Sequence, residues 1–497
     1  MTTVERIHVT ENERQIFDLL LRAVGNFSPE TKLRVAGGQN SSDIDIAISN
    51  MLPSAFLAEL NKYLRSQGED EVQGHVIESK PAQQGKQKPT LETVKMSLYN
   101  HSIDLVNLRR DVYERGSRIP VKVVFASPEE DAFRRDLTIN SLFYNIHTGL
   151  VEDLTGRGMD DLKAGRIATP LHARDTFLED PLRVLRAIRF AARFGFPLDE
   201  QLKEAASSEE VRAALAGEVS RERIGNEIDL MISGNRPVSA LHLLSDLKLL
   251  GLVFALPASS EPNCVSLSLC RAYVEAMWNL IHTPGLVNLS GEQIRHALYA
   301  ALLLPFRKMV YKEKTRKSSA APLVNYMLKV SMKRKSSDAE TVVNIHRATG
   351  RFLSLKNGVV QVDKREWGAT DVFEHLESIC QDDPEVPATS KTRVLAGFLL
   401  KDIRDLWPVA ALLTSLLLST DEVNQREIYL RIAGTIREMC LDTIWDEKPL
   451  VDASDIIKAL QLTNRGPIIR EWQQRLLAWQ LAYPKGMPMA KRSKAPM

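Results

Sequence analysis

Cysteine is scarce in this 497-residue sequence. The four cysteines are widely spaced and include no C-x-x-C pair; they are Cys264, Cys270, Cys380 and Cys440. This distribution argues against a zinc site and against a disulfide framework, and it fits a reducing compartment. The composition is otherwise that of a globular protein, with 44% hydrophobic and 26% charged residues, and the length allows several domains.

Long hydrophobic runs are also missing. No stretch of 18 apolar residues occurs, so we expect no membrane span. The first 13 residues contain three glutamates and lack an apolar core, which argues against a secretory signal and against an acid-poor transit peptide. We therefore expect a cytoplasmic or nuclear protein, or an organellar one (mitochondrial or plastid) if a longer precursor exists.

A strong net charge is missing as well. The formal charge is only +2, so binding to nucleic acid would depend on local basic patches. Three segments are rich in lysine and arginine, at residues 307–317, 329–335 and 485–494. Such segments are usually solvated surface, but in a protein that handles nucleotides they are candidates for contacts with an RNA backbone.

The apolar pattern divides the chain into a mixed part and a helical part, which predicts an α+β fold. In residues 1–150 we expect a loop over 65–90, and helices and strands alternating around it. The expected helices are Asn12–Ala23 and Phe56–Leu64, and the expected strands are Leu33–Ala36, Asp43–Ile48, Thr93–Leu98 and Ile103–Leu108. The expected helical domains cover 151–250, 251–380 and 381–483, and a disordered basic end covers 484–497.

Two aspartates at alternate positions of a strand are the most informative feature. Gly37 and Gly38 end one expected strand, a polar turn follows, and Asp43 and Asp45 lie in the next strand. Carboxylates two apart on a strand face the same way, and they repel unless a cation lies between them. The layout suits Mg²⁺, and glycines allow backbone N–H groups to approach a phosphate. The alternative is an exposed turn with two solvated aspartates.

A second group of polar residues follows at 129–142. Two adjacent arginines precede Asp136, and Asn140 comes four residues later. If this segment opens a helix, Asp136 and Asn140 face the same way. Arg135 could then hold a triphosphate, and Asp136 with Asn140 could bind a ribose. The alternative is a solvated, charged helix start.

A third group is a helix with an arginine face. Asp180 before Pro181 is typical of an N-cap with proline at the first helical position. The helix then presents four arginines on about a third of its circumference, with few acids within pairing distance after Asp180. The arginines are Arg183, Arg186, Arg189 and Arg193. Phosphate would match them, because a guanidinium binds it bidentately, although solvated arginines that cover apolar surface are an alternative.

A fourth segment, 218–228, is interpreted structurally. Ser220 resembles a helix cap, and Arg223 with Glu227 has the spacing of an i,i+4 ion pair.

Together these segments resemble the class II tRNA nucleotidyltransferases, or CCA-adding enzymes, and the related bacterial poly(A) polymerases. The resemblance covers about residues 31–230, and the helical remainder is similar to eukaryotic, plant-like members more loosely. It implies an α/β nucleotidyltransferase head followed by an all-helical neck, body and tail. It also implies addition of C, C and A to tRNA 3′ ends from CTP and ATP, without a nucleic-acid template.

The resemblance further implies roles for individual residues. Asp43 and Asp45 would bind two Mg²⁺ ions, one assisting attack by the 3′-OH and the other stabilising the departing pyrophosphate. Asp104 could be a third carboxylate or a structural residue. The nucleotide-binding residues would be Gly37, Gly38, Arg135, Asp136, Asn140, Asp180, Arg183, Arg186 and Arg189. Within this set, Asp180 and Arg183 would pair with the incoming base, and Arg186 and Arg189 would support them.

The sequence departs from the family pattern at one place. The family has a short helix between its glycine pair and Asp-x-Asp, whereas here Gly38 is followed by only four residues before Asp43. This shortening predicts weaker triphosphate binding and reduced activity. Three alternatives therefore stay open: a poly(A) polymerase-like activity, a catalytically weak tRNA-binding isoform, and a helical scaffold. The expected partners are nucleoside triphosphates and the acceptor end and elbow of tRNA; monomer and homodimer are both compatible with the sequence.

Overall fold

The computed structural model describes residues 7–36, 43–78, 92–112, 122–257, 264–312, 320–356, 388–461 and 467–483. The chain divides into two compact units, Met1–Leu252 and Val253–Met497. The predicted end segment 484–497 lies outside the described residues, and the finer division into four domains stays a prediction. In the described ranges, no helix has both the length and the apolar character that a membrane crossing needs.

A seven-stranded sheet forms the centre of the first part of the chain, in the order β3-β4-β5-β2-β1-β8-β9. The strands are β1 (Leu33–Ala36), β2 (Asp43–Ile48), β3 (Gly74–Glu78), β4 (Glu92–Leu98), β5 (His101–Asn107), β8 (Leu142–Asn145) and β9 (Leu150–Asp153). β2 runs parallel to β5, and the other neighbouring pairs are antiparallel. The four predicted strands are confirmed within a residue or two.

The predicted loop over 65–90 is wrong in one part, because it contains β3. This strand pairs with β4 at the edge of the sheet, and its Val76 and Ile77 are each 47% exposed. Its strand conformation therefore depends on the partner β4, which an isolated stretch of sequence does not reveal. β4 and β5 are joined by Tyr99 and Asn100, both with positive φ angles (46° and 63°), as a tight hairpin turn requires.

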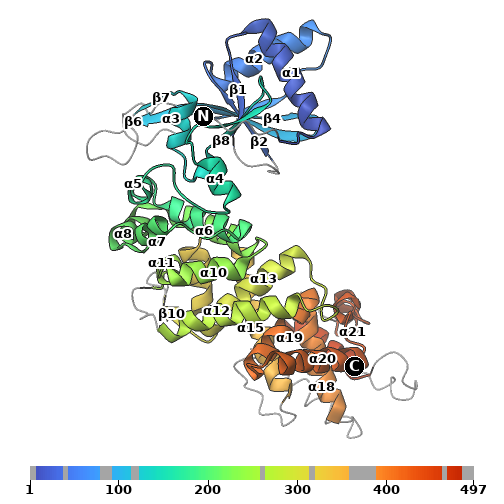
Figure 1. Cartoon of the computed structure of the whole chain (residues 1–497). Coiled ribbons are helices and arrows are strands. Elements are labelled where there is room, and N and C mark those ends of the chain that lie inside the picture. Colours follow the sequence, from blue (N-terminus) through green and yellow to red (C-terminus); the bar gives the residue numbers. More distant parts are fainter. Residues whose placement is uncertain are drawn as a thin grey trace. The chain divides into compact units, whose positions relative to one another are not determined.

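Two helices cover one face of this sheet, α1 (Glu11–Phe27) and α2 (Pro53–Ser66) (Figure 1). Thr10 begins α1 with a capping box, in which its hydroxyl accepts from the Glu13 backbone N–H and the Glu13 carboxylate accepts from the Thr10 N–H. The main hydrophobic core lies between these helices and the sheet. It includes Ile44, Ile46 and Ile48 of β2.

The opposite face of the sheet carries a smaller core. It contains Ala36, Ala47, Leu108, Ala132 and Phe143. Because side chains alternate along a strand, burial of Ile44, Ile46 and Ile48 on the first face places Asp45 and Ala47 on this second face. Helix α3 (Pro128–Phe133), the ribbon β6–β7 (Arg109–Val112, Lys122–Phe125) and the short helix η1 (Thr138–Asn140) belong to this part of the chain.

Helices follow β9. They are α4 (Gly158–Lys163), α5 (Ala173–Glu179), α6 (Leu182–Phe194), α7 (Glu200–Ser207), α8 (Glu209–Glu218), α9 (Arg221–Ile232), α10 (Pro237–Asp246) and α11 (Leu250–Val253). α6 packs against α5, α9 and α10. Its apolar side buries Val184, Leu185 and Ile188, as its sequence pattern predicts.

The second unit is also mostly helical. Its longer helices are α12 (Cys264–Ile281), α13 (Gly291–Leu302), α15 (Ser336–Lys356), α18 (Ala388–Ile403), α19 (Trp407–Leu418), α20 (Glu422–Glu438) and α22 (Pro467–Ala482). Shorter elements are η2 (Leu304–Phe306), β10 (Val310–Lys312), β11 (Ala320–Pro322), α14 (Leu323–Tyr326), η3 (Met327–Ser331), η4 (Arg404–Leu406), η5 (Ile444–Asp446) and α21 (Ala453–Ala459). α19 is apolar on nearly all sides and is buried accordingly. The α+β fold class is confirmed, with a mixed sheet first and helices after it.

Candidate active site

Asp45 is exposed on the sheet face that carries the smaller core. In the antiparallel neighbour β1 it lies opposite Ala36, and in the parallel neighbour β5 it lies beside Asp104. Asp43 is the first residue of β2, but its side chain, like the predicted Gly37 and Gly38, lies outside the described residues. The described part of the Asp-x-Asp motif is thus on a strand, as predicted.

Asp104 places a second carboxylate beside Asp45. Neighbouring strands are about 4.8 Å apart, and Asp104 shares the face of Asp45 because Ile103 and Leu105 are buried in the main core. Its Oδ2 pairs with Lys95 Nζ at 2.8 Å, whereas its Oδ1 is buried and has no hydrogen-bond partner. A buried carboxylate oxygen without a partner is costly, and a hard cation would satisfy it. The donor chemistry of this pair therefore fits Mg²⁺.

Asp131 anchors the arginine pair that precedes Asp136. Its carboxylate is 1% exposed and accepts hydrogen bonds from Arg134 and Arg135 at 2.6 to 3.1 Å, together with the Arg109 N–H. Burial acts to raise the pKa of Asp131, but the Arg135 and Arg134 guanidinium groups outweigh it and hold that pKa below its usual value. Arg135 also lies over the Phe143 ring, 4.7 Å from its centroid. Arg135 is thus fixed in place next to the smaller core.

Asp136 and Asn140 meet as predicted, although not on a helix. The helix α3 ends at Phe133, and Asn140 ends η1. Asn140 Nδ2 donates to Asp136 Oδ1 at 3.1 Å, and Arg186 Nε donates to Asp136 Oδ2 at 2.6 Å. Burial acts to raise the pKa of Asp136, yet Arg186 and the Asn140 hydrogen bond hold it below the ordinary value. Asp136 therefore stays charged and links η1 to α6.

The start of α6 differs by one residue from the prediction. The helix begins at Leu182 with Pro181 as its cap, while Asp180 Oδ1 accepts from the Leu182 N–H at 3.3 Å. Asp180 Oδ2 pairs with Arg223 Nη2 at 2.8 Å. Arg183 donates to Glu179 at 2.7 Å and to the Arg134 carbonyl at 2.8 Å. The last contact connects α6 to the segment that holds Asp131.

The predicted shortage of acids around the α6 arginines is wrong. Three of the four have carboxylate partners, two of them from distant segments: Arg183 with Glu179, Arg186 with Asp136, and Arg189 with Glu227 at 2.7 Å. A need for phosphate does not follow for these three. Sequence reasoning missed the pairs because 50 and 38 residues separate Arg186 from Asp136 and Arg189 from Glu227.

Glu227 is the functional neighbour that the sequence interpretation placed incorrectly. Ser220 caps α9 as predicted, but Arg223 pairs with Asp180 and Glu227 pairs with Arg189, so the expected Arg223–Glu227 pair does not form. Glu227 is only 6% exposed and belongs to the buried side of α9 with Ile224 and Ile228. A glutamate on the apolar side of a helix is the signal that could have indicated a partner in another element.

A separate cluster in the second unit has the residue types of a metal site, but its aspartate is already paired with an arginine. Ligand atoms of Glu292, His296 and Asp338 lie within 4.8 Å of one another. Asp338, however, is already bound by Arg295 at 2.9 and 3.2 Å and contacts His296 at 3.3 Å. Both Asp338 oxygens are therefore occupied, unlike Oδ1 of Asp104, so we assign no metal there.

The region that contains Asp45, Asp104 and Asp136 matches a known protein family. The sequence profile of the poly A polymerase head domain matches residues 35–168, which contain β2, β5 and the Asp136 segment. The mitochondrial CCA tRNA nucleotidyltransferase of Saccharomyces cerevisiae is 31% identical over 499 residues, covering 94% of this chain and 86% of the relative.

Solved structures share the fold. The Bacillus stearothermophilus CCA-adding enzyme in complex with CTP has a TM-score of 0.56 at 17% identity, covering 95% of this chain and 93% of that one. The Thermotoga maritima CCA-adding enzyme complexed with tRNA has a TM-score of 0.55 at 15% identity, covering 99% of this chain and 98% of that one. With the near full-length match to the yeast enzyme, these likenesses show that the chain belongs to the family of CCA tRNA nucleotidyltransferases.

Proposed function

We propose that this protein adds C, C and A to tRNA 3′ ends from CTP and ATP, without a nucleic-acid template. The observation that carries the proposal is the pair Asp45 and Asp104, side by side on an open sheet face. The name of the yeast relative and the CTP and tRNA complexes of the structural neighbours support the same substrates.

We assign metal binding to Asp43 and Asp45, with Asp104 as a third carboxylate. The unpartnered Asp104 Oδ1 supports this set. Two Mg²⁺ ions bound there would neutralise the triphosphate and lower the pKa of the attacking 3′-hydroxyl. The carboxylates would hold these ions in place, because Asp45 and Asp104 lie on neighbouring hydrogen-bonded strands.

The residues around Asp136 would bind the triphosphate and ribose. We propose that Gly37 and Gly38 present backbone N–H groups to phosphate and that Arg135 adds positive charge nearby. Asp136 already accepts bonds from Asn140, Arg186 and the Leu137 N–H. We therefore assign Asp136 to positioning Asn140 and Arg186, and assign the ribose contact to Asn140.

Asp180 and Arg183 would recognise the base. One side chain accepts hydrogen bonds and the other donates them, which matches the edge of a cytosine or adenine. In the structure Asp180 binds Arg223 and Arg183 binds Glu179, so base binding shares or replaces these contacts. Arg186 and Arg189 support this end of α6 through Asp136 and Glu227.

The test uses tRNA that lacks its CCA end, with Mg²⁺ and with CTP and ATP supplied separately and together. Incorporation of C, C and A in that order is expected. Incorporation of A alone would replace the proposal with the poly(A) polymerase activity that the head-domain match also allows. No incorporation with tRNA binding retained would favour a catalytically weak isoform.

The short link between β1 and β2 is expected to lower activity. Only residues 37–42 separate the two strands, and the family's short helix would supply further triphosphate contacts. Inserting the short helix of a family member after Gly38 should lower the KM for CTP and raise kcat. Equal kinetics with and without the insertion would contradict this part of the proposal.

The location is proposed on the relative's name alone. The yeast relative is a mitochondrial enzyme, which supports an organellar pool of this protein. Imaging of a fluorescent fusion expressed from the complete gene would decide between an organellar and a cytoplasmic or nuclear location.

A further inference from the structure

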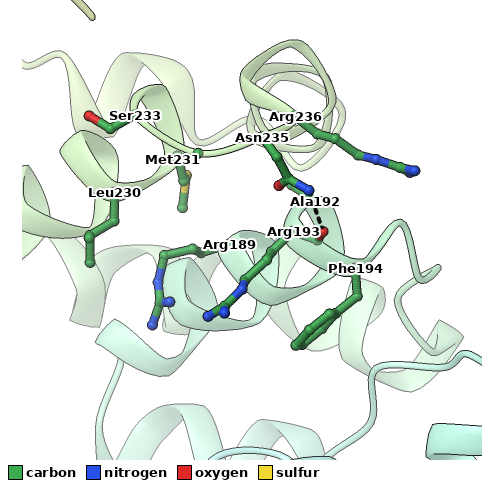
Figure 2. Close-up of a pocket in the computed structure, with 10 residues that line it drawn as sticks. Arg189, Ala192, Arg193, Phe194, Leu230, Met231, Ser233, Asn235 and Arg236 are labelled. Atoms are coloured by element: carbon green, nitrogen blue, oxygen red, sulfur yellow. Dashed lines mark hydrogen bonds between the residues drawn. The ribbon is translucent and has the colours of Figure 1, made fainter. Parts of the chain in front are cut away.

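A pocket at the C-terminal end of α6 lies apart from the residues assigned above to metal and base. Its volume is about 540 Å³, and it lies between α6, the end of α9 and the link 233–236 (Figure 2). Three arginines line it, Arg189, Arg193 and Arg236, and none of its lining residues is acidic. The pocket therefore attracts anions.

Two of the three arginines are uncompensated. Arg189 pairs with Glu227, but Arg193 and Arg236 have no carboxylate partner within the described ranges. This contrasts with Arg183 and Arg186 at the other end of the same helix, which are both paired. The uncompensated charge of α6 is thus concentrated at its C-terminal end.

The local backbone holds Arg236 against the end of α6. Gly195 ends the helix with a φ of +71°, and a Cβ at this position would lie 2.1 Å from Arg236 Nη1. Asn235 Nδ2 donates to the Arg193 carbonyl at 3.1 Å, as the dashed line in Figure 2 shows. The left-handed turn therefore favours glycine at 195, which also leaves room for the Arg236 side chain beside the helix end.

An aromatic side chain completes the pocket. Phe194 lines it and is 42% exposed, which is unusual for a phenylalanine. It stacks on Phe190 with 5.9 Å between ring centroids and 16° between planes, and the Arg193 guanidinium lies 5.4 Å from the Phe194 centroid. Figure 2 shows Arg189, Arg193 and Phe194 extending from the same side of α6. Arginines beside an open aromatic ring are typical of sites that bind single-stranded nucleic acid.

We propose that this pocket binds single-stranded RNA near the tRNA 3′ end, with one backbone phosphate at Arg193, another at Arg236 and a base against Phe194. This rests on the proposed function for the identity of the RNA. Ten residues of α6 separate Arg183 from Arg193, about 15 Å along the helix axis. The pocket is therefore a second contact on the helix that carries the base-recognition residues, and an RNA strand could follow α6 between the two.

The experiment measures binding of tRNA lacking CCA by fluorescence anisotropy at several salt concentrations. The double variant Arg193→Gln with Arg236→Gln should bind about tenfold more weakly, and the slope of log K against log salt should fall by about 0.7 for each lost phosphate contact. Phe194→Leu should weaken binding about fivefold without changing the slope. The KM for CTP should stay unchanged in all variants.

A matched control removes a comparable charge elsewhere. Arg22 on α1 is exposed and has no carboxylate partner in the described residues. It lies on the helix layer that covers the sheet face opposite the one with Asp45. Arg22→Gln should bind tRNA like the wild type. If the double glutamine variant has a lower melting temperature, the double lysine variant at the same positions should restore both melting temperature and most of the affinity.

Several results would overturn the inference. One is a folded double glutamine variant with unchanged tRNA affinity and unchanged salt slope. Another is a raised KM for CTP with unchanged tRNA affinity, which would assign the pocket to a triphosphate. Wild-type protein that does not bind tRNA would also overturn it. The anisotropy experiment measures tRNA binding and needs no nucleotide incorporation. A wild-type protein that does not add CCA would therefore contradict the proposed function, whereas the role of the pocket would still be tested.

Discussion

Two regions of the first unit differ in how their charged side chains are paired. Around α6, buried carboxylates and arginines are matched one to another: Asp131 with Arg134 and Arg135, Asp136 with Arg186, and Glu227 with Arg189. On the sheet face, Asp45 is exposed and the neighbouring Asp104 keeps a buried oxygen without a partner. Paired buried charges hold elements together without a ligand, whereas an exposed carboxylate beside a buried carboxylate oxygen that has no hydrogen-bond partner indicates where a ligand would bind.

The largest effect should follow from removing the exposed carboxylate of Asp45 on the sheet face. Asp45→Asn is expected to lower nucleotide incorporation by about 10²- to 10³-fold, because a neutral amide no longer stabilises the charge that develops in the transition state. Thermal unfolding should barely change, since Asp45 is exposed. Asp18→Asn, an exposed position on α1, is the matched control and should leave both properties intact. Unchanged incorporation in Asp45→Asn would remove the basis of the metal assignment.

Removing a carboxylate from the paired charges around α6 should instead lower the free energy of unfolding. Glu227→Gln leaves Arg189 without its carboxylate partner in a largely buried place and removes the weaker 4.0 Å contact of Arg186, and we expect a loss of about 3 kcal/mol in the free energy of unfolding. Urea denaturation measures it. Glu200→Gln, which breaks an exposed i,i+3 pair with Lys203, should cost less than about 0.5 kcal/mol. Equal losses in the two variants would contradict the assignment of the Glu227–Arg189 pair as a buried contact that holds α9 to α6.

Stabilisation by Mg²⁺ tests the metal site without any enzymatic turnover. If Asp104 contributes to a cation site, Mg²⁺ at ten times its Kd should stabilise the wild type by about 1.4 kcal/mol and Asp104→Asn by less. The measurement is the melting temperature across a Mg²⁺ titration, with EDTA as the starting point. Identical titrations for the two proteins would show that the unpartnered oxygen plays no part in binding.

The smallest effect is expected for the stability contribution of Asp136 as the pH is lowered. The pKa of Asp136 is held below its ordinary value in the fold, so its stabilising contribution is complete above the unfolded value of about 3.9 and is lost as the pH falls through the folded value. The stability difference between the wild type and Asp136→Asn should therefore be constant from pH 7 to pH 5 and shrink below about pH 4. Urea denaturation at pH 7, 5, 4 and 3 measures it. A difference that grows in acid would contradict this assignment of charge.

The sequence predicts local features well and pairings between segments poorly. The bounds of β1 and β2 follow from alternating apolar residues between turn signals, and Ser220 is recognised as a cap because its hydroxyl acts on its own helix. β3 was missed because an edge strand depends on its neighbour. The partners of Arg186 and Arg189 were missed for a related reason, since a residue's own segment carries no record of which distant carboxylate the fold brings to it.

The parallel pairing of β2 with β5 makes the chain unequally tolerant of changes in length. Parallel neighbours require a long crossover, and here it contains α2, β3 and β4. Residues added between β3 and β4 would enlarge the rim of the sheet and leave the Asp45–Asp104 register unaltered. Residues added or lost between β1 and β2 act directly on the strand that begins with Asp43. Natural variation in length should therefore accumulate in the crossover, and the short link before Asp43 is where it would alter chemistry.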